Sequence, residues 1–327
     1  MADERVSFAG RSVLVTGATG VVGSWLVKDL LSQGATVVAL LRDEPPDSEL
    51  LRSGQIALVA KVRGGLEDLR LLQRTLAEYE VDVIFHLGAQ TQVMTADRDP
   101  LGTLEANVRG TYNLLEAMRI AAPRAPTVIA SSDKAYGHAE SLPYTESHPL
   151  AGRGVYDASK SAADLIATAY GRTFNLPIGI ARCGNVYGGG DLNWARLVPG
   201  TIRSLLRGER PILRSDGRPR RDYLYVRDAA GAYLRVAESL LAGSAWGEAF
   251  NFGHGVPVSV AEIVGALGTI TGRTDLEPII RAEADREIGD QWLDASKARA
   301  RLGWEPAYGL TDGLTETVAW YQELLGR

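Results

Sequence analysis

The chain has 327 residues, which is enough for one large α/β domain or for two smaller units that share an interface. Hydrophobic residues make up 45% and charged residues 23%, values that exclude wholesale disorder and a coiled coil. The net charge of −5 argues against a general nucleic-acid or anionic-membrane binder. No apolar stretch is long enough to cross a bilayer, and the single cysteine, Cys183, excludes an internal disulfide and a cysteine-based zinc site.

Two further features bear on the setting of the protein. The first ten residues, MADERVSFAG, carry charges but lack the apolar core of a secretory signal. Together with the lone cysteine, this predicts a cytoplasmic location. The four histidines are scattered without the spacing of metal ligands, so we expect no bound metal.

The first half of the sequence alternates short apolar runs with amphipathic stretches. Strands are expected at residues 11–16, 35–41, 81–86, 127–130 and 177–182, and helices at residues 23–33, 66–79, 101–121 and 156–173. Alternation of this kind predicts an α/β fold with a Rossmann-type, doubly wound parallel sheet and helices on both faces.

A glycine-rich turn joins the first expected strand to the first expected helix, in the sequence GATGVVG. Its glycines are Gly17, Gly20 and Gly23. They permit a tight turn and let a pyrophosphate approach the helix N-terminus, where free N–H groups favour anions. Glycine turns between strand and helix are common, but this strand–turn–helix context favours dinucleotide binding.

The alternation becomes irregular after residue 182. We therefore expect a dinucleotide-binding domain at residues 1–182 and a smaller C-terminal α/β substrate domain at residues 183–327. Strands near residues 221–226 and 249–252 are expected to return to the main sheet. The last helix, residues 311–325, is amphipathic, which predicts that it packs against the rest of the chain.

A tyrosine and a lysine occur one helical turn apart in the sequence YDASK, at Tyr156 and Lys160. A nearby ammonium lowers the pKa of a phenol, so the pair is suited to proton transfer by a phenolate. Ser132 follows the strand at residues 127–130. Because ligands bind beyond the carboxyl ends of parallel strands, the helix that carries Tyr156 is expected to meet Ser132 there.

Together these motifs resemble the extended short-chain dehydrogenase/reductase family, the nucleotide-sugar epimerases and dehydratases. The resemblance covers essentially the whole chain. Its motifs, in order, are VTGATGVVG, HLGAQ, NVRGT, SSDKAYG, YDASK, RDYLYVRD and SKARARLGWEP. It implies an enzyme whose cofactor is NAD or NADP.

The resemblance also implies a set of cofactor-binding residues. These are Gly17, Gly20, Val21, Gly23, Arg42, Leu66, Leu87, Ala89, Asn107, Tyr156 and Lys160. The nearest likeness is to users of NAD, and Asp43 fits the ribose 2′-hydroxyl. Arg42 fits a 2′-phosphate equally well, so NADP is not excluded. Gly65 replaces the aspartate that family members commonly set against the adenine, which leaves that contact to Leu66.

By the same resemblance, Tyr156 removes the proton of the sugar 4-hydroxyl, Lys160 holds the nicotinamide ribose and Ser132 binds the sugar oxygen. Asp133 and Lys134 match the Asp-Lys pair of CDP-glucose 4,6-dehydratases, in which an acid and a base eliminate water. A lysine base must first lose its charge. The alternative for Lys134 is an ion pair with a carboxylate at the rim of the site.

Substrate-binding positions of the family fall on Gln90, Asn185, Arg196, Arg221 and Arg286. Between residues 203 and 227, eight arginines stand against three acidic residues, an excess that favours an anionic ligand such as a diphosphate. The generic RDYLYVRD replaces a tryptophan-containing sequence of the CDP-glucose enzymes, so the nucleotide base stays open.

Three functions remain on these grounds. The first is a nucleotide-sugar 4,6-dehydratase, the second is a 4-epimerase on the same scaffold, and the third is a non-catalytic dinucleotide sensor. A non-catalytic sensor would not require the catalytic set of Ser132, Tyr156 and Lys160, so these residues argue against the third function. The resemblance also implies a homodimer through helices 101–121 and 156–173, in which alanines permit close packing, namely Ala158, Ala162, Ala163 and Ala167.

Overall fold

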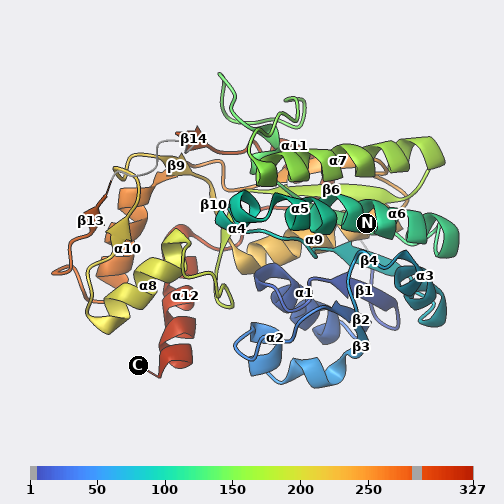
Figure 1. Cartoon of the computed structure of the whole chain (residues 1–327), viewed down its shortest axis with the longest axis horizontal. Coiled ribbons are helices and arrows are strands. Elements are labelled where there is room, and N and C mark those ends of the chain that lie inside the picture. Colours follow the sequence, from blue (N-terminus) through green and yellow to red (C-terminus); the bar gives the residue numbers. More distant parts are fainter. Residues whose placement is uncertain (1–5, 282–288, 327) are drawn as a thin grey trace.

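The computed structural model describes residues 6–281 and 289–326. Its centre is a seven-stranded, fully parallel sheet with the order β11-β6-β5-β4-β1-β2-β3 (Figure 1). The strands are β1 (Ser12–Thr16), β2 (Thr36–Leu41), β3 (Ala60–Arg63), β4 (Val83–His86), β5 (Thr127–Ser132), β6 (Ile178–Cys183) and β11 (Glu248–Phe252). The predicted Rossmann-type sheet is confirmed.

Helices cover both faces of this sheet, and each face has its own apolar core. One face carries α3 (Leu69–Glu78), α6 (Gly110–Ala121) and α7 (Val155–Phe174). The other carries α1 (Val21–Ser32), α9 (Val226–Leu241) and α11 (Ser296–Leu302). Strands buried on both faces explain why runs such as TVVALL in β2 are continuously apolar rather than alternating.

The strand order reverses beside β1, which has β2 on one side and β4 on the other. In an open parallel sheet, the loops on either side of such a reversal separate and leave a crevice at the carboxyl ends of the strands. The loops after β1, β4 and β5 all end at this edge. The fold therefore places the glycine-rich turn, the HLGAQ segment and the SSDKAYG segment side by side.

The remaining elements belong mostly to a smaller C-terminal part with its own core. They are β7 (Asn185–Tyr187), α8 (Leu197–Arg207), β8 (Ile212–Leu213), β9 (Arg220–Arg221), β10 (Tyr223–Tyr225), β12 (Val258–Ser259), α10 (Val260–Ile270), β13 (Ile279–Ile280), β14 (Asp290–Gln291) and α12 (Leu310–Leu325). The apolar face of α12 is buried at Leu314, Val318 and Tyr321, as its pattern predicts.

One of the two strands expected to rejoin the main sheet does so. β11, at residues Glu248–Phe252, pairs with β6 at the edge of the sheet. The expectation for residues 221–226 is wrong. β6 already lies between β5 and β11, so β10 pairs instead with β7, and β9 joins a small sheet with β12 and β14.

The helix expected at residues 101–121 is present, and a π-helical turn interrupts its α-helical hydrogen bonding. It consists of α5 (Pro100–Leu104), a π-helical turn at Glu105–Arg109, and α6. The other short elements are α2 (Glu49–Arg52), a 3₁₀ turn at Gln55–Leu58, α4 (Val93–Arg98) and a 3₁₀ turn, η3, at Asp133–Tyr136. Among the described residues, no helix is long and apolar enough to cross a membrane.

Candidate active site

The glycine-rich turn after β1 is tightly constrained. Gly17 has a φ of +72°, and a Cβ there would lie 2.7 Å from the Gly88 backbone nitrogen in the loop after β4. A Cβ on Gly23 would lie 2.0 Å from the Gly17 carbonyl oxygen. Gly20 caps α1 without a side-chain hydrogen bond, so the first N–H groups of the helix face outward. Val21 is the first residue of α1, and this backbone is suited to an anion.

Asn107, in the π-helical turn, joins two further parts of the site. Its side chain accepts from the Gln90 N–H at 2.7 Å and donates to the Gln90 carbonyl oxygen at 2.9 Å. It also donates to Ser159 Oγ at 2.9 Å, and Ser159 donates to the Tyr156 carbonyl oxygen at 2.7 Å. Asn107 therefore fixes the start of α7 to the loop that follows β4.

A buried histidine continues this network beneath the site. Thr111 Oγ1 donates to the Asn107 carbonyl oxygen at 2.6 Å, so it accepts from His86 Nε2 at 3.1 Å. The Gly88 N–H donates to Thr16 Oγ1 at 3.0 Å, which leaves the Thr16 hydroxyl to donate to His86 Nδ1 at 2.8 Å. Burial lowers the pKa of His86 to about 3, so the ring is neutral and bridges β1 and α6.

Ser132, Asp133 and Lys134 directly follow one another at the end of β5. Ser132 Oγ donates to Asp133 Oδ1 at 2.9 Å and accepts from the Lys134 N–H at 3.2 Å. Asp133 is 1% exposed, and its Oδ2 has no hydrogen-bond partner among the described residues. A buried carboxyl oxygen of this kind is available to a ligand.

Tyr156 and Lys160 lie in the first turns of α7, which packs against η3. Lys160 is 7% exposed, and its Nζ donates to the Ala130 carbonyl oxygen at 3.1 Å. Burial lowers the pKa of Lys160 to about 8, although the charges of Asp164 and Cys183 act in the opposite direction. The sequence pattern thus brings Tyr156 and Lys160 to the same edge as Ser132.

The Tyr-x-x-x-Lys spacing predicts a lowered pKa for Tyr156, but the protein groups around Tyr156 raise this pKa. Burial raises the pKa of Tyr156, and the negative charges of Asp133 and Asp157 raise it further. The Arg196 guanidinium lowers it, as does hydrogen bonding with Ser132.

Arg196 precedes α8 and faces Tyr156 across the two parts of the molecule. Its Nη1 lies 2.6 Å from Asp191 Oδ2, and its Nη2 donates to the Val186 carbonyl oxygen at 2.7 Å. The Tyr321 hydroxyl donates to the Asp191 carbonyl oxygen, which ties this arginine to α12. Asp191, for which the sequence analysis predicts no role, orients Arg196.

The other predicted substrate residues lie on nearby strands of the C-terminal part. Arg221 in β9 is 4% exposed and donates to the Gly289 carbonyl oxygen at 2.6 Å. Asn185 begins β7, where its N–H donates to the Asp222 carbonyl oxygen. Gln90 Nε2 donates to the Gln92 carbonyl oxygen at 2.9 Å. Arg286 lies outside the described residues.

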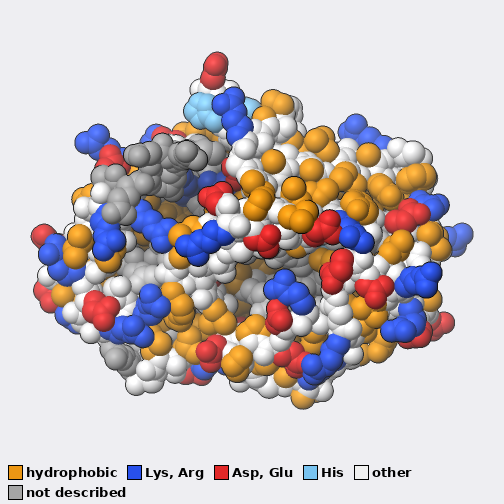
Figure 2. Space-filling view, viewed as in Figure 1, with side chains coloured by type: hydrophobic (Ala, Val, Ile, Leu, Met, Phe, Trp, Pro, Cys, Tyr) orange, Lys and Arg blue, Asp and Glu red, His pale blue; other side chains and the backbone are white. Residues whose placement is uncertain are grey.

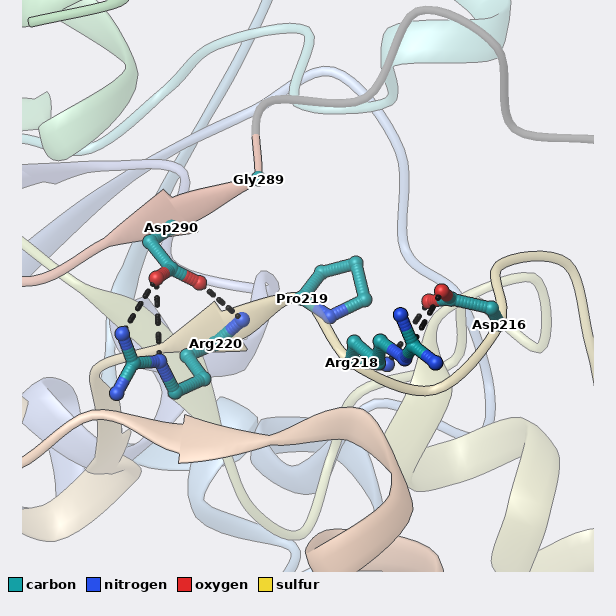
Figure 3. Close-up of a pocket in the computed structure, with 6 residues that line it drawn as sticks. All are labelled: Asp216, Arg218, Pro219, Arg220, Gly289 and Asp290. Atoms are coloured by element: carbon teal, nitrogen blue, oxygen red, sulfur yellow. Dashed lines mark hydrogen bonds and ion pairs between the residues drawn. The ribbon is translucent and has the colours of Figure 1, made fainter.

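The arginine-rich segment is mostly a solvated surface. Of its eight arginines, Arg221 alone is buried. Figure 3 shows a surface hollow where Arg220 pairs with Asp290 at 2.6 Å and Arg218 pairs with Asp216 at 3.5 Å. The excess of positive charge is therefore spread outward, and Arg221 is the arginine of this segment that turns inward.

The expected adenosine end of the crevice carries Arg42 and Asp43 after β2. The two exposed side chains form an ion pair at 2.7 Å, so the structure leaves both cofactor alternatives open. Leu66 packs against Gly110, where an added Cβ would lie 2.8 Å from the Leu66 Cβ. Leu87 and Ala89 lie in the loop after β4, at the carboxyl edge of the sheet, and both are partly exposed.

Asp222, the residue after Arg221, has a structural role that the sequence analysis does not predict. Its carboxylate accepts backbone N–H groups of His254 at 2.8 Å, Gly255 at 3.1 Å and Leu293 at 3.2 Å. Burial raises the pKa of Asp222, and these hydrogen bonds lower it. The first acid of the RDYLYVRD motif, Asp222, is thus structural, because it joins three segments of the C-terminal part.

Gln291 is a further residue that the sequence did not single out. It is 0% exposed, and its Oε1 accepts a hydrogen bond from Lys134 Nζ. It comes from β14, far along the chain from Lys134. No local pattern marks it, because the contact depends on how the two parts of the molecule meet.

Comparison with known proteins gives three concordant relatives. A CDP-glucose 4,6-dehydratase of Salmonella typhimurium is 33% identical over 96% of this chain and 91% of its own length. A UDP-glucose 4-epimerase of Mycolicibacterium smegmatis is 33% identical over 94% of this chain and 98% of its own. A crystal structure of dTDP-glucose 4,6-dehydratase from Streptomyces venezuelae, with NAD bound, superposes with a TM-score of 0.87 at 31% identity and covers 96% of this chain and 98% of its own.

A family model described as GDP-mannose 4,6 dehydratase matches residues 14–317, nearly the whole chain. The matched span includes the glycine-rich turn, the Ser132 to Lys134 segment and the Tyr156–Lys160 pair. The chain therefore belongs to the GDP-mannose 4,6 dehydratase family, within the extended short-chain dehydrogenases/reductases.

Proposed function

We propose that the protein is a nucleotide-sugar 4,6-dehydratase, which converts an NDP-hexose to an NDP-4-keto-6-deoxyhexose. The observation that supports this proposal is the arrangement after β5. Asp133 offers a buried carboxyl oxygen without a partner among the described residues, with Lys134 next to it and Tyr156 across from it. A 4-epimerase requires no acid and base for elimination, whereas a dehydratase requires both.

The cofactor that we assign is NAD. Its pyrophosphate would lie at the N-terminus of α1, where Gly17 and Gly23 have no room for a side chain and the first N–H groups face outward. Leu66, Leu87, Ala89 and Asn107 would line the rest of the crevice. When bound, NAD would supply the acceptor for the C4 hydride of the sugar and the source of the hydride that C6 receives.

Tyr156 would take the proton of the sugar 4-hydroxyl, and Ser132 would donate a hydrogen bond to the oxygen that becomes the C4 carbonyl. Because burial raises the pKa of Tyr156, a positive charge nearby is needed for the phenolate. Arg196 already lowers this pKa. Lys160 would bind the nicotinamide ribose close to the tyrosine.

Elimination then follows from the C4 ketone, which acidifies the hydrogen on C5. The neutral amine of Lys134 removes the C5 proton, and the electron pair of that C–H bond forms the C5–C6 double bond. The C6–O bond breaks, and Asp133 gives its proton to the departing hydroxide, so one water leaves. Lys134 would then return a proton to C5, and C6 would receive the hydride removed from C4, which completes the 4-keto-6-deoxy product.

The substrate diphosphate would bind between the two parts of the molecule. Arg221 and Arg196 supply the positive charge, and Asn185 precedes both in the chain, at the start of β7. Gln90 borders the opposite side, after β4. The substrate is thus a nucleoside diphosphate sugar, and the proposed location of the enzyme is the cytoplasm.

A direct test is mass spectrometry of the products formed from a panel of CDP-, UDP-, GDP- and dTDP-hexoses with NAD. We expect one nucleotide sugar to lose a single water, which also identifies the base. If the mass stays the same and a 4-epimer appears, the protein is a 4-epimerase and the elimination assignment is wrong. Absence of any product from the full panel would contradict both.

We also propose a homodimer through the outer faces of α5, α6 and α7. Figure 2 shows hydrophobic side chains gathered over this face. The exposed apolar residues on it are Leu101, Leu104, Tyr112, Ile120, Leu165 and Phe174. Ala163 and Ala167 do not belong to it, contrary to expectation, because both are buried within the chain itself, Ala167 in its apolar core. Such a contiguous apolar face is typical of an interface.

A further inference from the structure

The two short strands β9 and β14 form a ribbon with an outer and an inner face. They pair in parallel, with Arg220 opposite Asp290 and Arg221 opposite Gln291. Successive side chains of a strand point to opposite faces. Arg220 and Asp290 accordingly form the exposed ion pair of Figure 3, whereas Arg221 and Gln291 are buried on the other face.

The inner face of this ribbon reaches the end of β5. Gln291 Oε1 accepts a hydrogen bond from Lys134 Nζ, across the boundary between the C-terminal part and the main sheet. The orientation of the amide is determined by its partner, because an ammonium group only donates and requires the oxygen of the glutamine. Gln291 is 0% exposed, so solvent does not replace this contact.

The backbone around Gln291 is held from both sides. The Tyr144 N–H donates to the Trp292 carbonyl oxygen at 2.9 Å, and the Asp294 N–H donates to the Tyr144 carbonyl oxygen at 2.8 Å. On the other side, Asp222 binds the Leu293 N–H. The segment that carries Gln291 is therefore fixed to the η3 side and to the ribbon at once.

The charges near Lys134 come from several elements. Among the described residues, Asp133 adjoins it in η3, and Asp157 in α7 feels its positive charge. Arg221 lies beside Gln291 in the ribbon, and Tyr144 and Tyr156 face Asp133. Gln291 adds a hydrogen-bond acceptor to this group without adding a charge.

We infer that Gln291 is a positioning residue, which holds the Lys134 amine at the substrate C5. The inference rests on the proposed function. A neutral amide accepts from the amine and stabilises the charged form less than a carboxylate does. Gln291 and Arg221 also adjoin each other, so the ribbon that holds the diphosphate also places the base.

The test compares Gln291→Glu with Gln291→Met, using the nucleotide hexose that the product panel identifies. The glutamate variant keeps shape and hydrogen bond but adds a charge. We expect its low-pH limb of kcat to move upward by about one pH unit, because the carboxylate raises the pKa of Lys134. The methionine variant loses the acceptor, and we expect kcat to fall about tenfold with little change in KM.

The control is Asp290→Asn, which breaks the outer ion pair of the same strand without touching Lys134. We expect its kcat and pH profile to match those of the wild type. An unshifted limb in Gln291→Glu, with an unchanged kcat in Gln291→Met, would overturn the inference. If the wild-type enzyme eliminates no water from any sugar, the proposed function fails instead, so the two failures are distinct.

Discussion

The proposed reaction consists of an oxidation at C4 and an elimination across C5–C6, and different residues act in the two steps. Asp133 is the proposed acid of the elimination. Asp133→Asn keeps the shape of the side chain but removes the proton that the leaving hydroxide needs. We expect water elimination to slow by about 10²- to 10³-fold, while oxidation at C4 continues. Reduced nicotinamide should then accumulate, which its absorbance measures in a single turnover.

The matched control for this variant is Asp157→Asn in α7. Both carboxylates raise the pKa of Tyr156, so both substitutions remove a negative charge that faces the tyrosine. Asp157 is not assigned to the leaving group. If both variants lose elimination equally, the effect belongs to the charge near Tyr156 and Asp133 is not the acid.

At the scale of elements, β4 is tied to β1 and α6 by a histidine that stays neutral. The pKa of His86 falls from 6.5 to about 3 in the folded protein, so below pH 6.5 the unfolded chain binds the extra proton. Unfolding therefore becomes easier as the pH falls. Acidification from pH 6 to pH 4 should therefore lower the free energy of unfolding of His86→Gln by about 2–3 kcal/mol less than that of the wild type.

Urea unfolding at those two pH values measures this difference. His138→Gln, on an exposed loop, serves as the control and should keep the pH dependence of the wild type. The assignment of a neutral, buried His86 is wrong if His86→Gln and the wild-type protein lose the same stability on acidification.

Elements with strong apolar patterns were predictable, and those defined by long-range pairing were not. β1, β2, β4, β5 and β6 are buried runs that the sequence identifies directly. β3 has only four residues of alternating burial, AKVR, and was missed. The segment of β9 and β10 looks like one strand, but its partners are chosen by the C-terminal part.

The same distinction holds for the site. Ser132, Tyr156 and Lys160 were predictable because the carboxyl ends of parallel strands meet at one edge. Gln291 was not, since it acts on Lys134 through a tertiary contact that leaves no local pattern. Asp191 is close to Arg196 in the sequence, but their contact depends on the conformation of the loop between β7 and α8. The raised pKa of Tyr156 likewise depends on burial and on Asp133, which a Tyr-x-x-x-Lys spacing does not contain.

At the scale of the whole molecule, the apolar face of α5, α6 and α7 determines the expected assembly. Leu165, in α7, is a 56% exposed member of this face. A charge placed there would be buried against the second copy at high cost, so Leu165→Arg should turn the dimer into a monomer at micromolar concentration. Sedimentation velocity measures the change.

Ile212→Arg is the control for this variant. Ile212 is 51% exposed in β8, away from the proposed interface, and its replacement should leave the dimer intact. A wild-type protein that sediments only as a monomer, or a Leu165→Arg variant that remains dimeric, would contradict the proposed interface.

The position of β11 at the edge of the sheet has a consequence for synthesis of the chain. While the ribosome is still making the segment between β6 and β11, the hydrogen-bonding groups on the edge of β6 that faces away from β5 have no neighbour. An open strand edge is a template for pairing with other nascent chains. β11 can cover this edge only after Phe252 has left the ribosome. Until that point, the nascent chain depends on its later segments or on a chaperone to avoid aggregation.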